Sequence, residues 1–137
     1  MGRLLVTTSI EDSWDPNLRT VFLGEWCKKS NRQHLWSKIE AEVAAPYGLE
    51  PKQKVRDNDE KHEFYDALLL ELSSKLNAFH QTDYSIRYWT ILIGPWLDSF
   101  MMVVMNRYKS LEVALNSFQI SKTILINQKD FSLTRNN

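Results

Sequence analysis

The stretch 21–27, VFLGEWC, constrains the fold more than any other part of this 137-residue chain. Its three apolar residues are typical of the end of a buried strand, and Gly24 allows the backbone to turn. Glu25, Trp26 and the single cysteine, Cys27, follow directly. Ligands of open α/β sheets bind outside the carboxyl ends of the strands, so the stretch predicts one wall of a site. The alternative is a turn glycine, a core tryptophan and a small buried cysteine.

Length and charge exclude several classes of protein. A chain of this size suits one domain with its own core. Lysine and arginine together number 17, as do the acidic residues, so the electrostatic footprint of a nucleic-acid binder is missing. One cysteine cannot form an internal disulfide, and the first residues lack the long apolar region of a secretory signal. We therefore expect a cytoplasmic protein with no nucleic-acid partner.

The apolar run 88–105 approaches transmembrane length. It contains Asp98, however, and a central aspartate is costly in lipid. We expect the run to be a buried helix of a soluble protein, and hence no transmembrane segment.

Short apolar runs and helical periodicity predict the remaining elements. Strands are expected at 4–8, 20–23 and 122–126, with a weaker one at 42–45 because alanine disfavours strands. A short helix is expected near 35–39 and a long one from Pro51 to about Phe79, the charged first half of which, 52–63, should lie in solvent. A helix from Tyr84 should break or kink at Gly94-Pro95 and can restart there toward Leu115.

This order predicts an α/β fold: a partial Rossmann-like parallel sheet of about four strands, with a long helical insertion between strands three and four. We expect residues 1–127 to form one domain, followed by a polar tail at 128–137. A doubly wound sheet normally continues beyond this point, so the chain is expected to be a truncated part of a larger protein.

Loops after parallel strands meet at one edge of the sheet, and here they carry acids, hydroxyls and aromatic rings. Carboxylates bind hydroxyl groups and rings stack on apolar sugar faces, so the set suits a sugar-like ligand. Glu11 or Glu25 could act as a general base if its surroundings raised its pKa. The other candidate binding residues of these loops are Thr8, Ser9, Trp14 and Trp26. The alternative for each carboxylate is a loop acid that caps a helix or meets water.

Three basic residues complete the candidate site. Arg32 and His34 could hold a phosphate, or they could be a solvated helix start. Arg87 could bind substrate, pair with Asp83, or be a structural cation stacked on a neighbouring ring.

Other familiar chemistry has little support. Cys27 with His34 could be a nucleophile and its base, which would make the chain a complete enzyme that an alkylating reagent inactivates. No dinucleotide fingerprint, P-loop or metal-ligand spacing is present, so we expect neither a cofactor nor a metal.

Several blocks of sequence also carry a family resemblance. They are Leu5–Thr8 with Glu11 and Trp14, Phe22–Cys27, Arg32–Trp36, Leu76-Asn77 with His80 and Asp83, and Ser85–Trp89 running into Ile91–Leu97. Together they resemble the amino-terminal part of a family of transferases found in bacterial surface-polysaccharide gene clusters.

The resemblance implies a GT-B glycosyltransferase whose amino-terminal half faces the acceptor. The implied partners are a nucleotide sugar and a saccharide acceptor in a longer protein, and the chain alone is expected to be inactive. A second hypothesis is a non-catalytic α/β interaction module that self-associates through the surface its missing half would cover.

Overall fold

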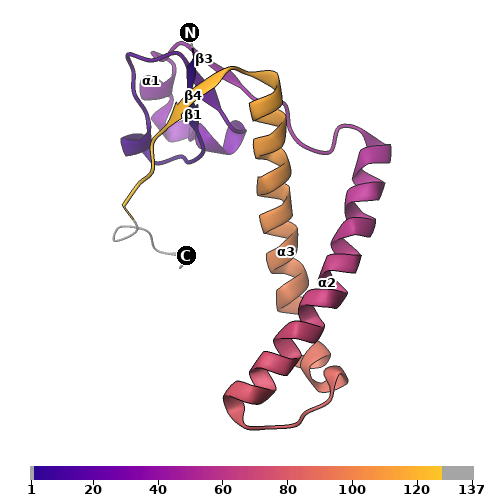
Figure 1. Ribbon diagram of the computed structural model, residues 1–137. Coiled ribbons are helices and arrows are strands. Elements are labelled where there is room, and N and C mark those ends of the chain that lie inside the picture. The colour runs from indigo at the N-terminus through magenta and orange to yellow at the C-terminus, as the bar shows by residue number, and fades with distance from the viewer. Residues whose placement is uncertain (1, 128–137) are drawn as a thin grey trace. The chain divides into compact units, whose positions relative to one another are not determined.

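The computed structural model describes residues 2–127 and contains a four-stranded sheet (Figure 1). The strands are β1 (Arg3–Val6), β2 (Thr20–Phe22), β3 (Ala41–Val43) and β4 (Ile120–Thr123). Their order is β3-β2-β1-β4, and every neighbouring pair is parallel. The predicted fold class is confirmed, including the long helical segment between the third and fourth strands.

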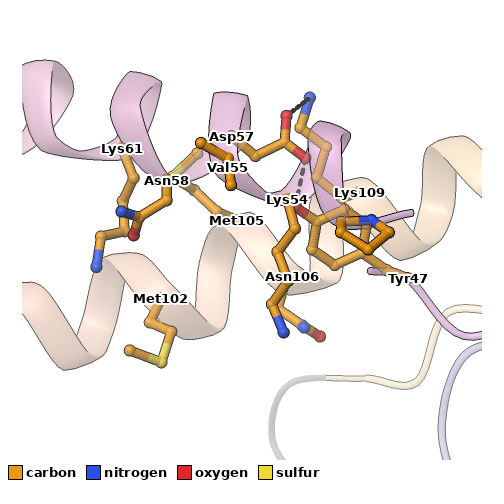
Figure 2. A pocket seen from close by; sticks show the side chains of 11 residues that line it. Tyr47, Lys54, Val55, Asp57, Asn58, Lys61, Met102, Met105, Asn106 and Lys109 are labelled. Carbon is orange, nitrogen blue, oxygen red and sulfur yellow. Dashed lines mark hydrogen bonds and ion pairs between the residues drawn. The ribbon is translucent and has the colours of Figure 1, made fainter. Parts of the chain in front are cut away.

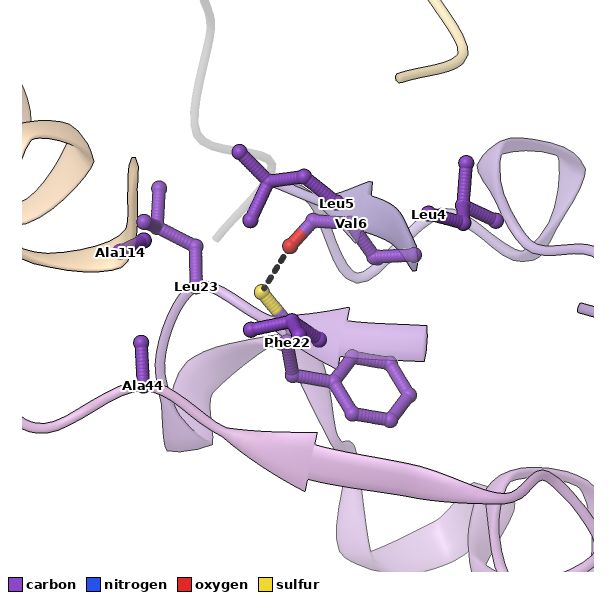
Figure 3. Packing of buried hydrophobic residues seen from close by; sticks show 9 residues of the cluster. Leu4, Leu5, Val6, Phe22, Leu23, Ala44 and Ala114 are labelled. Carbon is purple, nitrogen blue, oxygen red and sulfur yellow. Dashed lines mark hydrogen bonds between the residues drawn. The ribbon is translucent and has the colours of Figure 1, made fainter. Parts of the chain in front are cut away.

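The core of the sheet is built by its two central strands. Leu4, Leu5 and Val6 of β1 and Val21 and Phe22 of β2 are all buried. Parallel strands covered on both faces are apolar throughout, and both runs have this composition. Figure 3 shows Leu4, Leu5, Val6 and Phe22 with Ala44 and Ala114, which later segments contribute to the same cluster. Each large side chain here stabilises the fold by roughly 1.5–3 kcal/mol relative to an exposed one.

The predicted fourth strand, 122–126, is displaced from the observed one. β4 pairs with β1 through Arg3↔Ile120 and Leu5↔Thr123, and the Thr123 hydroxyl donates to the carbonyl of Leu5 at 2.9 Å. Because β1 is only four residues long, the ladder ends before the apolar residues 124–126 can join it.

The connecting segments after β1 and β2 contain short helical turns. They are η1 (Glu11–Ser13), η2 (Glu25–Cys27), η3 (Ser30–Arg32) and α1 (Gln33–Trp36). Two long helices follow, α2 (Pro51–His80) and α3 (Ile86–Ser117), and α2 begins and ends close to its predicted limits.

The residues group into two compact units. One runs up to Pro46 and resumes at Ser110, and the other is Tyr47–Lys109. We call them the sheet unit and the hairpin unit. The division into one domain at 1–127 stays a prediction, and the polar tail at 128–137 lies outside the described residues.

Asn77 organises the turn between α2 and α3. Its Oδ1 accepts hydrogen bonds from the Thr82 hydroxyl at 3.1 Å, the Tyr84 amide at 3.0 Å and the Trp89 indole at 3.0 Å. Its Nδ2 donates to the Tyr84 carbonyl at 2.9 Å. Two of the blocks that carry the family resemblance thus meet in this turn.

Of the predicted break or kink at Gly94-Pro95, the break is wrong, because α3 runs through both residues. An interior proline costs about 3 kcal/mol, but Leu97 and Met101 beyond it pack with Leu69 of α2, which favours a continuous helix. Gly94 instead leaves room for α2, since a Cβ there would lie 2.7 Å from the Tyr65 hydroxyl.

The expectation that this apolar run is buried is also wrong. α3 is long and apolar enough to cross a membrane by length and composition, yet only 22% of its apolar window is buried. Ile91, Leu92, Trp96 and Phe100 are among its exposed side chains. The charged half of α2 was expected to lie in solvent, but Asp57 in this half is buried, with only 5% of its surface exposed.

Candidate functional site

The carboxyl edge of β1 and β2 brings together two of the predicted site residues. The strands are parallel neighbours, so the segments that follow them leave from the same edge. Glu11, in η1 after β1, and Arg32, in η3 after β2, form a two-pronged ion pair. Nε of Arg32 donates to one carboxylate oxygen, and NH2 donates to the other at 2.6 Å. Such a fork fixes both side chains in one plane.

The electrostatics of this pair favour binding over proton transfer. The hydrogen bonds from Arg32, helped by the charges of His34 and Lys29, hold the pKa of Glu11 below its usual range. A general base for neutral pH would need this pKa raised. The carboxylate keeps lone pairs that can accept hydrogen bonds from ligand hydroxyls, and both side chains of the pair are partly exposed.

The turn that carries Arg32 is anchored by a residue that the sequence analysis placed only in a short helix. The indole of Trp36 donates to the carbonyl of Lys29 at 2.9 Å, and the Arg32 amide donates to the same carbonyl at 3.0 Å. Lys28 lies over the Trp36 ring, 5.1 Å from its centroid. A tryptophan seven residues after the Lys28-Lys29 pair is a signal that could have indicated this support.

Thr8 and Trp14 shape the loop that presents Glu11. The Thr8 hydroxyl shares a hydrogen bond of 3.1 Å with the buried Ser13 and accepts one from the amide of Ile10 at 3.1 Å. The Trp14 indole donates to the Thr8 carbonyl at 3.4 Å, and its ring meets Phe22 edge-on. Ser9 lies between them and is partly exposed. The roles of Thr8 and Trp14 visible here are structural, and their contact with a ligand stays a prediction.

Glu25 and Trp26 stand on the second loop of the same edge. Glu25 pairs with Lys28 at 3.0 Å and is largely exposed. The Trp26 ring is 42% exposed and lies against Gly24, where a Cβ would approach within 1.9 Å of it. Gly24 therefore makes room for the ring in this position, whereas its φ of −171° would suit any residue. The alternative interpretation of this stretch, in which Trp26 is a core residue, is therefore wrong for Trp26.

Cys27 is fully buried, as expected if it is a small core residue. Its thiol lies 3.6 Å from the carbonyl of Val6, to which it donates, as Figure 3 shows. A thiol with no access to solvent is poorly placed to attack a substrate, which argues against the nucleophile hypothesis.

Arg87 belongs to the hairpin unit, so no geometry joins it to the carboxyl edge of the sheet. It lies in the first turn of α3, beside Tyr88, which stacks on Tyr84 with ring centroids 4.2 Å apart. Its role in substrate binding stays a prediction.

The hairpin unit also contains a groove of about 630 Å³, which the sequence analysis missed (Figure 2). Val55, Met102 and Met105 give it apolar walls, and Lys54, Lys61 and Lys109 add positive charge. At one end the buried Asp57 accepts hydrogen bonds from Tyr47 and, at 2.8 Å, from Gln53.

These contacts satisfy Asp57 from within the protein. The hydrogen bond from Tyr47 holds the pKa of Asp57 below its usual range, and Lys109 lies 3.7 Å away. Burial, with the neighbouring Asp57, raises the pKa of Tyr47 to about 12. Because Asp57 and Lys109 are engaged with each other and Lys61 pairs with Asp98, we place the candidate site at the carboxyl edge of the sheet and not in this groove.

Within the described part of the chain, no cluster of three or more histidine, cysteine, aspartate or glutamate side chains could hold a metal ion. Curated proteins yielded no match to this sequence, and neither did the solved structures. The family model described as LIC12162 family transferase matches residues 3–137. The match covers the whole sheet, both long helices and every candidate site residue, and the chain therefore belongs to the LIC12162 family of transferases.

Proposed function

We propose that this chain forms the acceptor-binding side of a glycosyltransferase-like enzyme that uses a nucleotide sugar in bacterial surface-polysaccharide synthesis in the cytoplasm. Membership of a transferase family supports the class of reaction. The resemblance of the Phe22–Cys27 and Ser85–Leu97 blocks to polysaccharide-cluster transferases supports the sugar substrate.

The observation that carries the proposal is the position of the Glu11–Arg32 pair. The strand order β3-β2-β1-β4 reverses at β1, and ligands of open parallel sheets bind at such a switch point, outside the carboxyl ends of the strands. Glu11 stands on the segment that leaves β1 at this point and is fixed by Arg32.

Each element of the site has a defined part in this proposal. The Glu11 carboxylate accepts hydrogen bonds from sugar hydroxyls, while Arg32 holds it ionised and offers its own N–H groups. The exposed ring of Trp26 stacks on an apolar sugar face. Glu25, which is largely exposed and pairs with Lys28, is the remaining carboxylate that this proposal assigns as the base.

The test is to titrate acceptor oligosaccharides and nucleotide sugars into the full chain and follow binding by calorimetry. Glu11→Gln and Arg32→Lys should each weaken saccharide binding by about tenfold or more, because the first neutralises the accepting carboxylate and the second removes the two-pronged guanidinium that fixes it. Glu71→Gln is the matched control, since Glu71 forms a comparable exposed ion pair with Lys75 on α2. Equal saccharide affinity in all three variants would contradict the proposal.

A non-catalytic interaction module is the second candidate, and the exposed apolar side chains of α3 favour it. It predicts self-association of the chain together with no saccharide binding in the same titration.

A further inference from the structure

We infer that the hairpin unit docks on a lipid bilayer through one face of α3. This outer face consists of Tyr88, Leu92, Trp96, Phe100 and Val103. Steps of four and three residues place these side chains on one side of the helix. All five are between 41% and 61% exposed, so a continuous apolar strip of about four helical turns lies open.

The opposite side of α3 is already occupied. Leu97 and Met101 pack against Leu69 of α2. Asp98 pairs with Lys61 of α2 at 2.9 Å, so the acid that interrupts the apolar run is turned toward α2 and away from the outer face. The cost of placing an aspartate near lipid, which argues against a spanning segment, therefore does not apply to the outer face.

The sequence that surrounds the strip matches the chemistry of a bilayer surface. Arg87-Tyr88 and Arg107-Tyr108 bracket residues 89–106, in which Asp98 is the only charged residue. Tyrosine and tryptophan favour the boundary between lipid and water, and arginines at the ends of apolar stretches reach toward phosphate groups. Tyr84 stacks on Tyr88 at the tip of the hairpin and extends the aromatic surface there.

The helix fits a position in the plane of the surface and not across the bilayer. Its partner α2 carries Glu71 and Lys75, which are both exposed, and the Lys61–Asp98 pair joins the two helices. A hairpin with one apolar face and one charged helix behind it has the pattern of an interfacial helix. A protein partner is less well matched, because protein interfaces surround their apolar centres with polar residues, whereas this strip is apolar along its length.

The test is co-sedimentation of the full chain with vesicles of phosphatidylcholine containing phosphatidylglycerol. Wild-type protein should pellet with the vesicles, and Leu92→Glu and Val103→Glu should each lower the vesicle affinity by at least about tenfold. The exposed α2 residues Leu70 (62%) and Val55 (61%) supply matched controls, because Leu92 and Val103 are 59% and 61% exposed. Leu70→Glu and Val55→Glu should bind vesicles as the wild type does.

Circular dichroism and sedimentation equilibrium complete the design. Unchanged helical content in all four variants would assign the loss of vesicle binding to the outer face. No vesicle binding by the wild type, or equal binding by all variants, would overturn the inference. So would a lipid-free dimer that Leu92→Glu dissociates, because a second copy would then cover the face. The inference stands apart from the proposed function, since saccharide titration involves Glu11 and Arg32 and not these residues.

Discussion

Asp57 shows how a single buried charge can be held by its neighbours. It lies on the half of α2 that was expected in solvent, and the sequence alone gave no sign of its burial because Tyr47 is ten positions away. Tyr47 and Gln53 donate to its two carboxylate oxygens, and Lys109 of α3 supplies an opposite charge. A buried carboxylate that is satisfied in this way depends on all of its partners.

Tyr47→Phe should lower the free energy of unfolding by about 1–3 kcal/mol at pH 7, because Asp57 loses a hydrogen-bond donor while it stays buried. The lowered pKa of Asp57 means that its contribution is complete above the unfolded value, about 3.9, and is lost as the pH falls through the folded value. The difference between variant and wild type should therefore shrink in acid. Urea unfolding at pH 7 and pH 3 measures it, with the exposed Tyr108→Phe as control.

The raised pKa of Tyr47 makes stability depend on pH in the opposite direction, with a loss in base and not in acid. Its neutral form is favoured in the folded chain, so stability should be complete below pH 10 and fall as the pH rises toward about 12. Tyr108→Phe, which keeps Tyr47, should lose stability between pH 10 and about 12, whereas Tyr47→Phe should not. The reverse result would contradict the assignment of this pH dependence to Tyr47.

At the scale of elements, the turn between α2 and α3 depends on one side chain. Asn77 satisfies backbone groups of the turn and also holds Trp89, while Gln81 ends α2 with a left-handed φ of 55°. Because four hydrogen bonds meet on one amide, the turn has little tolerance for its loss.

Asn77→Ala should lower the free energy of unfolding by about 2–6 kcal/mol, since it removes four hydrogen bonds of roughly 0.5–1.5 kcal/mol each. Asn77→Asp keeps the acceptor and loses only the donor to Tyr84, so its effect should be smaller. Urea unfolding followed by far-ultraviolet circular dichroism compares the two. Equal losses in both variants would mean that the acceptor contacts contribute little.

The sequence predicts those elements whose signal is local. The apolar runs at 4–8 and 20–23 indicate buried parallel strands, and Pro51 marks the start of α2. The helix continues through Gly94-Pro95 because packing against α2 outweighs the local cost of proline. At the site, the parallel strands correctly place the segments of Glu11 and Arg32 at one edge, but their pairing depends on loop paths that no periodicity encodes. The catalytic role of Glu25 stays a prediction.

At the scale of the whole molecule, two units of different core size share one chain. Among residues 2–127, the sheet unit has a cluster of nine buried apolar residues, whereas the cluster of the hairpin unit has three. Stability rises with the apolar area buried, so local opening should begin in the hairpin unit.

Leu97→Ala should remove about 2–5 kcal/mol from the hairpin unit, because Leu97 is among the three buried residues of its core. Hydrogen exchange should then show weaker amide protection in α2 and in α3 up to Lys109, with β1 and β2 unchanged. Val21→Ala is the reciprocal control in the sheet. An equal loss of protection in both units would show that 1–127 unfolds as one cooperative domain.

The late position of β4 also affects how the chain is made. β1 lies in the middle of the sheet, but one of its edges pairs only with residues that leave the ribosome more than a hundred positions later. Until then Leu4, Leu5 and Val6 offer an open, apolar strand edge to other nascent chains. The rate at which the helical segment is translated thus sets how long the newborn protein is exposed to misassembly.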